Sequence, residues 1–240
     1  MLLGNTSDIF RRMSHAAMRA GRGPDEVKLV AVTKTVDIRA IEEAINIGMR
    51  IFGENRVQEA QKKIEYFRGS RKNFPEGNSS GVQWHLIGHL QKNKAKYAVR
   101  LFDLIHTVDS IDLAEELSKC AEKAGKVQRV LVQVKLSEEE TKHGAREDAL
   151  MGILGRMKEL GNLRPEGLMT MPPFFDDPEN ARPYFRRLRE LRDEAERAGY
   201  RLTELSMGMS GDFETAIEEG ATMVRIGSAI FGERQRKEKA

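Results

Sequence analysis

The chain has 240 residues, and its 40 Lys and Arg against 37 Asp and Glu give a net charge of +3. This small excess is not the clustered basic face of a nucleic-acid-binding protein, and no apolar run is long enough to cross a bilayer. The single cysteine, Cys120, excludes an intramolecular disulfide framework. Because the N-terminus also lacks a signal-peptide pattern, we expect a cytoplasmic protein that contacts neither membrane nor nucleic acid.

Strand-like and helix-like segments alternate along the chain. A polar helical segment comes first, at 6–20, and amphipathic segments such as 38–45 and 113–120 separate the strand-like runs. Alternation of this kind predicts a parallel sheet, and eight such units in roughly 250 residues are the usual size of a (β/α)₈ barrel. The strand-like runs lie at 28–34, 50–53, 83–87, 101–108, 129–136, 165–171, 202–206 and 222–227.

We therefore predict one domain over 1–240, in which a helical lead-in at about 6–20 precedes a single α/β barrel at about 28–234. A doubly wound open sheet is the competing architecture. The polar stretch 70–81, which contains proline, glycine and serine, is interpreted as a long loop and not as a domain boundary.

Three predicted strand ends carry residues suited to one ligand. Lys34 ends the first strand, Ser206 the seventh and Gly227 the eighth, and closure of a barrel places these ends side by side. Active sites in this fold lie at the C-terminal ends of the strands. Since lysine amines form imines and exposed backbone amides bind phosphate, the pattern indicates a phosphorylated aldehyde. The alternative is that Lys34 is an ordinary surface lysine.

Five motifs follow one another in order along about 28–234. They are Ala31–Thr35, Phe52–Asn55, Trp84–Gln91, Leu205–Ser210 and Met223–Ser228. Together they closely resemble those of the pyridoxal-phosphate homeostasis proteins of the YggS/PROSC type. The resemblance implies a barrel of PLP fold-type III, like the N-terminal domain of alanine racemase, with no second β domain. It also implies that pyridoxal 5′-phosphate (PLP) is held as a Schiff base on Lys34.

The same resemblance implies a protein that regulates, buffers or delivers PLP inside the cell and is not an enzyme. No catalytic residue is assigned, and the expected partners are PLP and the apo-forms of PLP enzymes. Weak side activity is compatible with this function, because an accessible imine of PLP exchanges with amino acids.

The resemblance also implies roles for the residues at the last two strand ends. Ser206, Gly227 and Ser228 hold the phosphate through hydroxyl and backbone N–H groups, and Arg225 faces the pyridine nitrogen. An arginine is always protonated, so it would keep that nitrogen from gaining a proton and weaken the ring as an electron sink. Without the resemblance, an ion pair at the barrel rim would explain Arg225 equally well.

Asn55 follows the second predicted strand and is expected to line the same mouth, where it hydrogen-bonds the cofactor or orients Lys34. Its alternative role is to cap the helix that follows. The sequence departs from the family at two positions: Arg56 stands where tyrosine is usual, and Lys135 stands where asparagine is usual.

The histidines do not predict a metal site. His85 and His89 are four residues apart, but Gly88 interrupts and the preceding run has the pattern of a strand, so the two need not share a helical face. His106 and Asp109 follow the fourth strand, where they are placed to form a hydrogen-bonded pair near the mouth.

Two enzymatic alternatives remain open. A PLP-dependent amino-acid racemase needs a second acid/base opposite the lysine, which racemases of this fold take from a tyrosine of an extra domain in the partner subunit. None of the four tyrosines here lies in a matched motif. A cofactor-free Schiff-base aldolase would instead use Lys34 to attack a phosphosugar directly.

Overall fold

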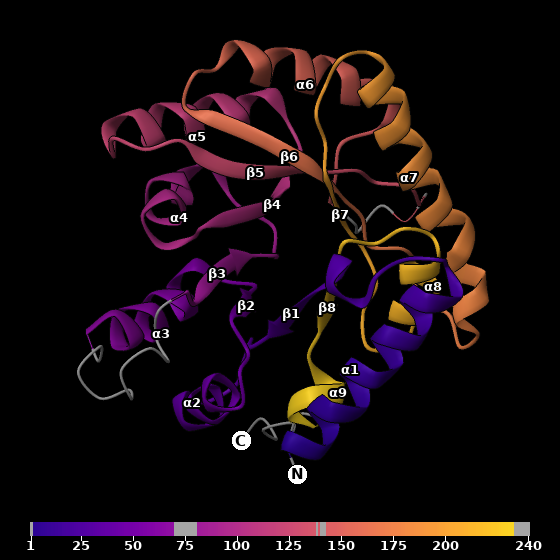
Figure 1. Cartoon of the computed structure of the whole chain (residues 1–240). Helices are drawn as coiled ribbons and strands as arrows, with labels where there is room; N and C mark the ends of the chain where they lie inside the picture. Colours follow the sequence, from indigo (N-terminus) through magenta and orange to yellow (C-terminus); the bar gives the residue numbers. More distant parts are fainter. Residues whose placement is uncertain (1, 70–80, 138, 140–142, 233–240) are drawn as a thin grey trace.

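Eight parallel strands form a closed barrel in the order β1 to β8, and β8 pairs with β1 to complete it (Figure 1). The computed structural model describes residues 2–69, 81–137, 139 and 143–232, so the predicted loop at 70–81 lies outside these ranges except for Gly81. The strands are β1 (Lys28–Val32), β2 (Ile51–Glu54), β3 (Gln83–Leu86), β4 (Leu104–Val108), β5 (Gln128–Gln133), β6 (Leu163–Met169), β7 (Glu204–Ser206) and β8 (Met223–Ile226).

Helices lie around the outside of the barrel and connect its strands (Figure 1). Short 3₁₀ turns at Pro24–Glu26, Lys92–Lys94, Glu147–Ala149 and Pro178–Ala181 lie between them. The α-helices are α1 (Leu2–Arg19), α2 (Ile38–Asn46), α3 (Val57–Gly69), α4 (Ala95–Leu101), α5 (Ile111–Lys123), α6 (Leu150–Glu159), α7 (Arg182–Arg197), α8 (Phe213–Glu218) and α9 (Ser228–Phe231).

The predicted (β/α)₈ barrel is confirmed, and the pairing of β8 with β1 excludes the open sheet. The lead-in helix runs from residue 2 to 19, slightly earlier than predicted. The run at 202–206 contains a strand only from Glu204, since the residues before it have no ladder partner. No helix in the described ranges is long and apolar enough to span a membrane.

The barrel interior changes from apolar to polar along the strands. Because alternate residues of a strand face the same side, the residue two positions after an inward apolar side chain also points inward. Leu104 is followed in this way by His106, and Met223 is followed by Arg225; all four are buried. The C-terminal half of the interior is therefore lined with polar groups that need partners.

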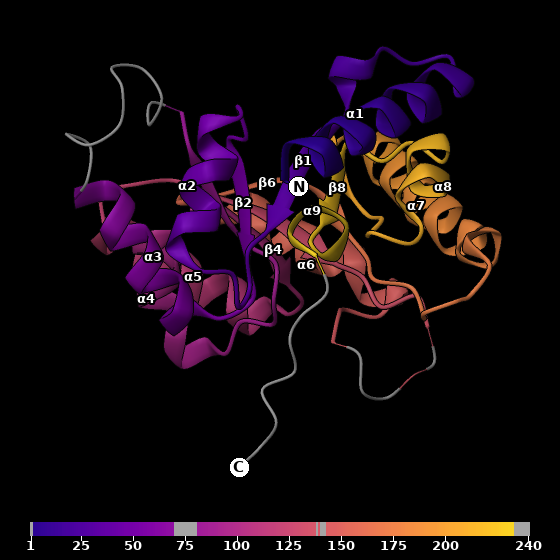
Figure 2. The same ribbon diagram turned by 90° about the horizontal axis from the view of Figure 1, so that it is seen from below.

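Helix α1 covers the outside of the barrel next to α8 and α9, as Figures 1 and 2 show from two directions. Its buried stripe includes Ile9 and Met13, and Arg12 pairs with Glu214 of α8 at 2.6 Å. The N-terminal segment is thus part of the hydrophobic core of the barrel.

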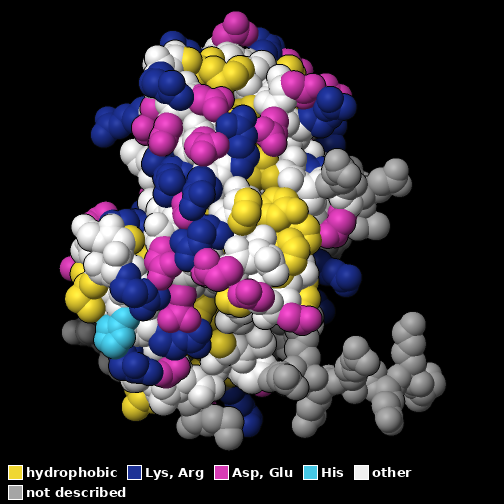
Figure 3. Space-filling model, turned by 90° about the vertical axis from the view of Figure 1, so that its right-hand side faces the viewer, with side chains coloured by type: hydrophobic (Ala, Val, Ile, Leu, Met, Phe, Trp, Pro, Cys, Tyr) yellow, Lys and Arg dark blue, Asp and Glu magenta, His cyan; other side chains and the backbone are white. Residues whose placement is uncertain are grey.

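The arginine-rich helix α7 is neutralised by its neighbours. Arg182, Arg186 and Arg189 all lie within 3.2 Å of carboxylate oxygens of Glu219, the residue that directly follows α8. Lys and Arg side chains alternate with Asp and Glu over this face of the molecule (Figure 3). The face is a network of ion pairs, which does not favour a nucleic-acid surface.

Candidate functional site

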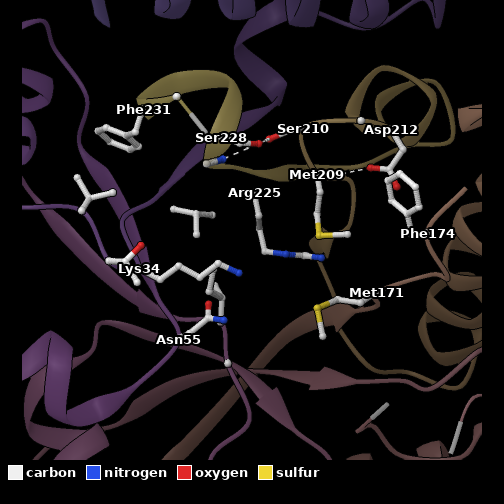
Figure 4. Close-up of a pocket in the computed structure, with 18 of the residues that line it drawn as sticks. Lys34, Asn55, Met171, Phe174, Met209, Ser210, Asp212, Arg225, Ser228 and Phe231 are labelled. Carbon is white, nitrogen blue, oxygen red and sulfur yellow. Dashed lines mark hydrogen bonds between the residues drawn. The ribbon is translucent and has the colours of Figure 1, made fainter. Parts of the chain in front are cut away.

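A cavity of about 1080 Å³ opens at the C-terminal ends of the strands. Lys34 enters it from the end of β1, Arg225 from β8, and Asn55 from the end of β2 (Figure 4). Serine and glycine residues of the loops after β7 and β8 form another part of its wall. The predicted lysine, arginine and asparagine therefore line one cavity.

Lys34 is half-buried and lies in a tight turn directly after β1. Its side chain extends toward Arg225, with Asn55 beside it (Figure 4). The next residue, Thr35, has a φ of +65°, a left-handed conformation that is rare for a β-branched residue. Such strain persists only where the surrounding structure holds it, and it is frequent at binding sites.

A buried ionic network holds this turn in place. Lys63 of α3 donates to the backbone oxygen of Thr33 at 2.6 Å, to Glu54 at 2.8 Å and to Glu59 at 2.7 Å. Thr33 Oγ1 donates to the same Glu54 oxygen at 2.6 Å, and the backbone N–H of Thr35 donates to Glu59 at 2.5 Å. Of the two residues that flank Lys34, Thr33 is therefore bonded to Lys63 directly and Thr35 is linked to it through Glu59.

Burial has an electrostatic consequence within this network. Desolvation raises the pKa of Glu54, and the hydrogen bond from Lys63 opposes that rise. Glu54 Oε2 is buried and has no hydrogen-bond partner in the described part of the chain. The network thus depends on Lys63, whose loss would leave Glu54 in an apolar site without its cation.

Arg225 is the first member of a hydrogen-bonded chain through the barrel interior. Its guanidinium donates to Ser206 Oγ at 2.6 Å and to the carbonyl of Thr170 at 2.9 Å. Ser206 Oγ lies 2.9 Å from His106 Nδ1, and His106 Nε2 lies 3.0 Å from His85 Nδ1. Every group is satisfied if Ser206 donates to His106 and His106 donates to His85, which fixes the tautomer of both rings.

Within this hydrogen-bonded chain both histidines are neutral and Arg225 is charged. Burial lowers the pKa of His85 to about 3 and the pKa of His106 well below its usual value. Burial also lowers the pKa of Arg225 to about 10, with Asp212 opposing the shift. Among the described residues no carboxylate lies within 4 Å of Arg225, so its charge faces the cavity without an ion-pair partner.

The loop after β7 approaches the loop after β8 through Ser210. Its Oγ lies 3.4 Å from the backbone nitrogen of Gly227 and 3.2 Å from Ser228 Oγ. Gly208, with a φ of +91°, turns the chain so that Ser210 reaches the cavity. Hydroxyls and the N–H groups of a helix first turn are typical phosphate ligands, so this corner can bind a phosphate.

Ser206 does not line this corner, contrary to expectation. It is fully buried beneath Arg225, and its hydroxyl is already engaged by Arg225 and His106. Ser210, four residues later, lies where the sequence placed Ser206. The second serine of the Leu205–Ser210 motif was the signal that sequence reasoning passed over.

The expected pair of His106 with Asp109 is also absent. His106 points into the barrel interior toward His85, whereas Asp109 lies 3.7 Å from His89. His85 and His89 lie in different surroundings, since His85 is buried and His89 is exposed at the mouth. Strand alternation explains this, because His106 and Asp109 are three residues apart and face different sides.

Asn55 turns toward the cavity (Figure 4), while α3 begins two residues later, at Val57. Its backbone is in close contact with Gly88: a Cβ at Gly88 would lie 2.2 Å from the Asn55 carbonyl oxygen. Arg56 does not line the main cavity and instead borders an adjoining one of about 880 Å³. Lys135 lines neither of these two cavities; its backbone N–H is bonded to Ala145.

Comparison with known proteins gives consistent matches over nearly the whole chain. A family model described as alanine racemase, N-terminal domain, matches residues 5–235. A pyridoxal phosphate homeostasis protein of Aquifex aeolicus (strain VF5) is 46% identical over 230 residues, which are 95% of this chain and 96% of the relative. A protein of the same name from Escherichia coli (strain K12) is 39% identical over 241 residues, 98% of this chain and 97% of the relative.

The fold is likewise similar to a solved structure. PipY of Synechococcus elongatus PCC7942, with PLP bound, has a TM-score of 0.81 and 35% sequence identity. The match covers 97% of this chain and 100% of PipY.

Proposed function

We propose where this protein binds its ligand and what it does with that ligand. The premise is that the chain belongs to the pyridoxal phosphate homeostasis proteins, whose barrel is that of the alanine racemase N-terminal domain. The protein binds PLP and takes part in PLP homeostasis. We place PLP in the cavity at the barrel mouth, held covalently on Lys34 as a Schiff base.

One observation carries this assignment: a buried guanidinium, which no carboxylate of the described residues approaches within 4 Å, faces the cavity that Lys34 enters. A buried charge needs a compensating group, and an acceptor nitrogen on an anionic ring supplies one. The two-serine corner at Ser210 and Ser228 suits the phosphate, and Lys34 suits the aldehyde. The residues present therefore fit each functional group of PLP.

Each residue then has a separate task. Ser210, Gly227 and Ser228 bind the phosphate, Arg225 donates to the ring nitrogen, and Asn55 lies beside the Lys34 amine. When bound, PLP supplies an aldehyde that reacts reversibly with primary amines. Since Arg225 is a donor in every accessible state, the ring nitrogen stays unprotonated, which favours storage of the cofactor over carbanion chemistry.

We propose that the protein is a reversible holder of PLP and not an enzyme. A racemase would need a second acid/base opposite the lysine, which racemases of this fold take from a tyrosine. Among the described residues that line the cavity there is no tyrosine. The apo-forms of PLP enzymes are the proposed recipients. The free, half-buried Cys120 supports a reducing compartment, and we place the protein in the cytoplasm.

The test is the absorption spectrum of the purified protein with PLP, before and after borohydride, followed by mapping of the reduced adduct. We expect a yellow protein whose adduct lies on Lys34, and no fixed adduct in Lys34→Ala. Lys92→Ala, which removes an exposed lysine, is the matched control. A colourless wild type that is labelled by a phosphosugar would support the aldolase instead.

The homeostatic action is tested separately by following transfer to an apo PLP enzyme. If the enzyme gains cofactor no faster from the loaded protein than from free PLP, delivery is excluded and buffering remains. Conversion of an L-amino acid to the D-amino acid at the rate of a dedicated racemase, beyond weak side activity, would overturn the non-enzymatic assignment.

A further inference from the structure

Three side chains of types that can ligate a metal ion meet at the barrel mouth: His89, Asp109 and His143, which we call the mouth triad. One potential ligand atom from each lies within 4.8 Å of those of the other two. His89 Nδ1 is 3.7 Å from Asp109 Oδ2, and the rings of His89 and His143 are stacked with centroids 3.7 Å apart and planes 10° apart.

The triad is assembled from three separate strand ends. His89 follows β3, Asp109 directly follows β4, and His143 lies in the connection after β5. Such a convergence of ligand-type side chains cannot be read from sequence spacing, because the two histidines are far apart in the chain.

The backbone beneath the triad is fixed by hydrogen bonds. Thr107 Oγ1 of β4 donates to the carbonyl of Gly88 at 2.8 Å, which ties the residue before His89 to the strand that Asp109 directly follows. Gln133 of β5 donates through its side chain to the carbonyl of His143 at 2.7 Å. Both histidines therefore project from anchored backbone.

We propose that His89, Asp109 and His143 bind a divalent transition-metal ion of the Zn²⁺ class at the mouth of the barrel. Two imidazoles and one carboxylate form a ligand set that suits zinc and its neighbours in the first transition row. Three protein ligands leave at least one coordination position open to solvent or to a small ligand.

The geometry needs only local adjustment. With bonds of about 2.0–2.1 Å, ligand atoms around a tetrahedral ion are separated by about 3.3 Å, close to the 3.7 Å between His89 and Asp109. The stacked rings must tilt so that their lone pairs converge, and both histidines are exposed at the surface and have room to rotate.

The proposed metal site adjoins the main cavity, but metal binding there does not require PLP. His89 lines both the main cavity and the adjoining one. An ion held there would occupy the mouth through which small molecules reach Lys34. The proposal stands or falls on metal binding, whatever the position of PLP.

The experiment is a titration of the full chain, freed of PLP, with Co²⁺ and with Zn²⁺. Calorimetry gives the stoichiometry, and the visible spectrum of bound Co²⁺ reports its ligand set and coordination. We expect one ion per chain, without the intense charge-transfer band of a thiolate ligand, which would point to Cys120.

Four variants decide whether the triad is the site. His89→Ala, Asp109→Asn and His143→Ala should each weaken binding by more than about tenfold, since loss of even outer-shell partners costs that much. His15→Ala, which removes an exposed histidine of α1, should bind like the wild type. Thermal unfolding of each metal-free variant shows whether it is folded.

Absence of saturable binding by the wild type would overturn the proposal. So would binding that survives all three triad substitutions, or binding that appears only when PLP is present and is insensitive to them. The last result would assign the ion to the phosphate of PLP.

Discussion

Lys63 donates a hydrogen bond of 2.6 Å to the backbone carbonyl of Thr33, the residue immediately before Lys34. A lysine with a side chain 8% exposed thus fixes the turn that presents another lysine to the cavity. Helix α3 therefore does more than cover the barrel, because it fixes the backbone position from which the Lys34 side chain extends.

We expect Lys63→Met to destabilise the protein by about 3 kcal/mol, because it leaves Glu54 buried without its cation. Lys62→Met, one residue earlier and exposed, should change the free energy of unfolding by less than about 0.5 kcal/mol. Urea unfolding of the two variants measures the difference. Equal stabilities would show that the network contributes nothing to the fold.

Sequence reasoning located Lys34 because an apolar run that ends in a lysine marks the end of a buried strand. It could not find the role of Lys63, since a lysine on an amphipathic helix has the pattern of a solvent-facing residue. What buries Lys63 is Glu54, which ends β2 and points into the protein. Such a pair is visible only when helix and strand are placed together.

Sequence reasoning assigned Ser206 to the cavity, whereas Ser210 lines it, and this difference has another physical cause. Both serines lie in one motif, and the choice between them depends on the left-handed φ of Gly208, which redirects the chain after β7. Similarly, the contact of His85 with His106 depends on the pairing of β3 with β4. Local periodicity predicts elements well, but it does not fix which side chains meet across the barrel.

Substitution of each serine tests which of the two binds the phosphate. We expect Ser210→Ala to weaken PLP binding while leaving stability nearly unchanged, because its hydroxyl faces the cavity. Ser206→Ala should instead lower the free energy of unfolding by about 1–3 kcal/mol, since Arg225 and His106 lose a buried partner. Equilibrium dialysis with PLP and urea unfolding separate the two effects, and the opposite pattern would restore Ser206 to the phosphate site.

Arg225→Gln should weaken PLP binding by about 10- to 100-fold, because a hydrogen bond from a charged donor contributes about 1.5–3 kcal/mol. Arg186→Gln on α7 is the control, since neither Arg186 nor its partner Glu219 lines the cavity. PLP affinity is measured by quenching of Trp84 fluorescence. An unchanged affinity in Arg225→Gln would remove the arginine from the cofactor site.

Gly88 should not tolerate a side chain. A Cβ there would lie 2.2 Å from the backbone oxygen of Asn55, so Gly88→Ala must displace the turn after β2 and is expected to cost about 2–3 kcal/mol. Gly152→Ala, within α6, has no atom within 4 Å of the added carbon and should stabilise the protein by about 0.5–1 kcal/mol. Thermal unfolding of the pair gives shifts of opposite sign if the contact is as close as described.

The buried histidines should make the protein less stable in mild acid. The pKa of His85 is lowered to about 3 and that of His106 also falls well below 6.5, both chiefly through burial. The unfolded chain therefore binds protons that the folded chain does not as pH falls below about 6.5, and unfolding becomes easier down to pH near 3. Each histidine contributes a slope of about 1.4 kcal/mol per pH unit in this window.

The variant His106→Gln isolates this contribution from the titration of carboxylates. Between pH 7 and pH 5 its free energy of unfolding should fall by about 2 kcal/mol less than that of the wild type, since one depressed pKa has been removed. His15→Gln, on the exposed face of α1, is the control and should follow the wild type, because it leaves the buried chain from Arg225 to His85 intact. A wild-type slope retained in His106→Gln would mean that His106 is protonated in the folded barrel, and the one-directional hydrogen-bond chain from Arg225 to His85 could not then exist.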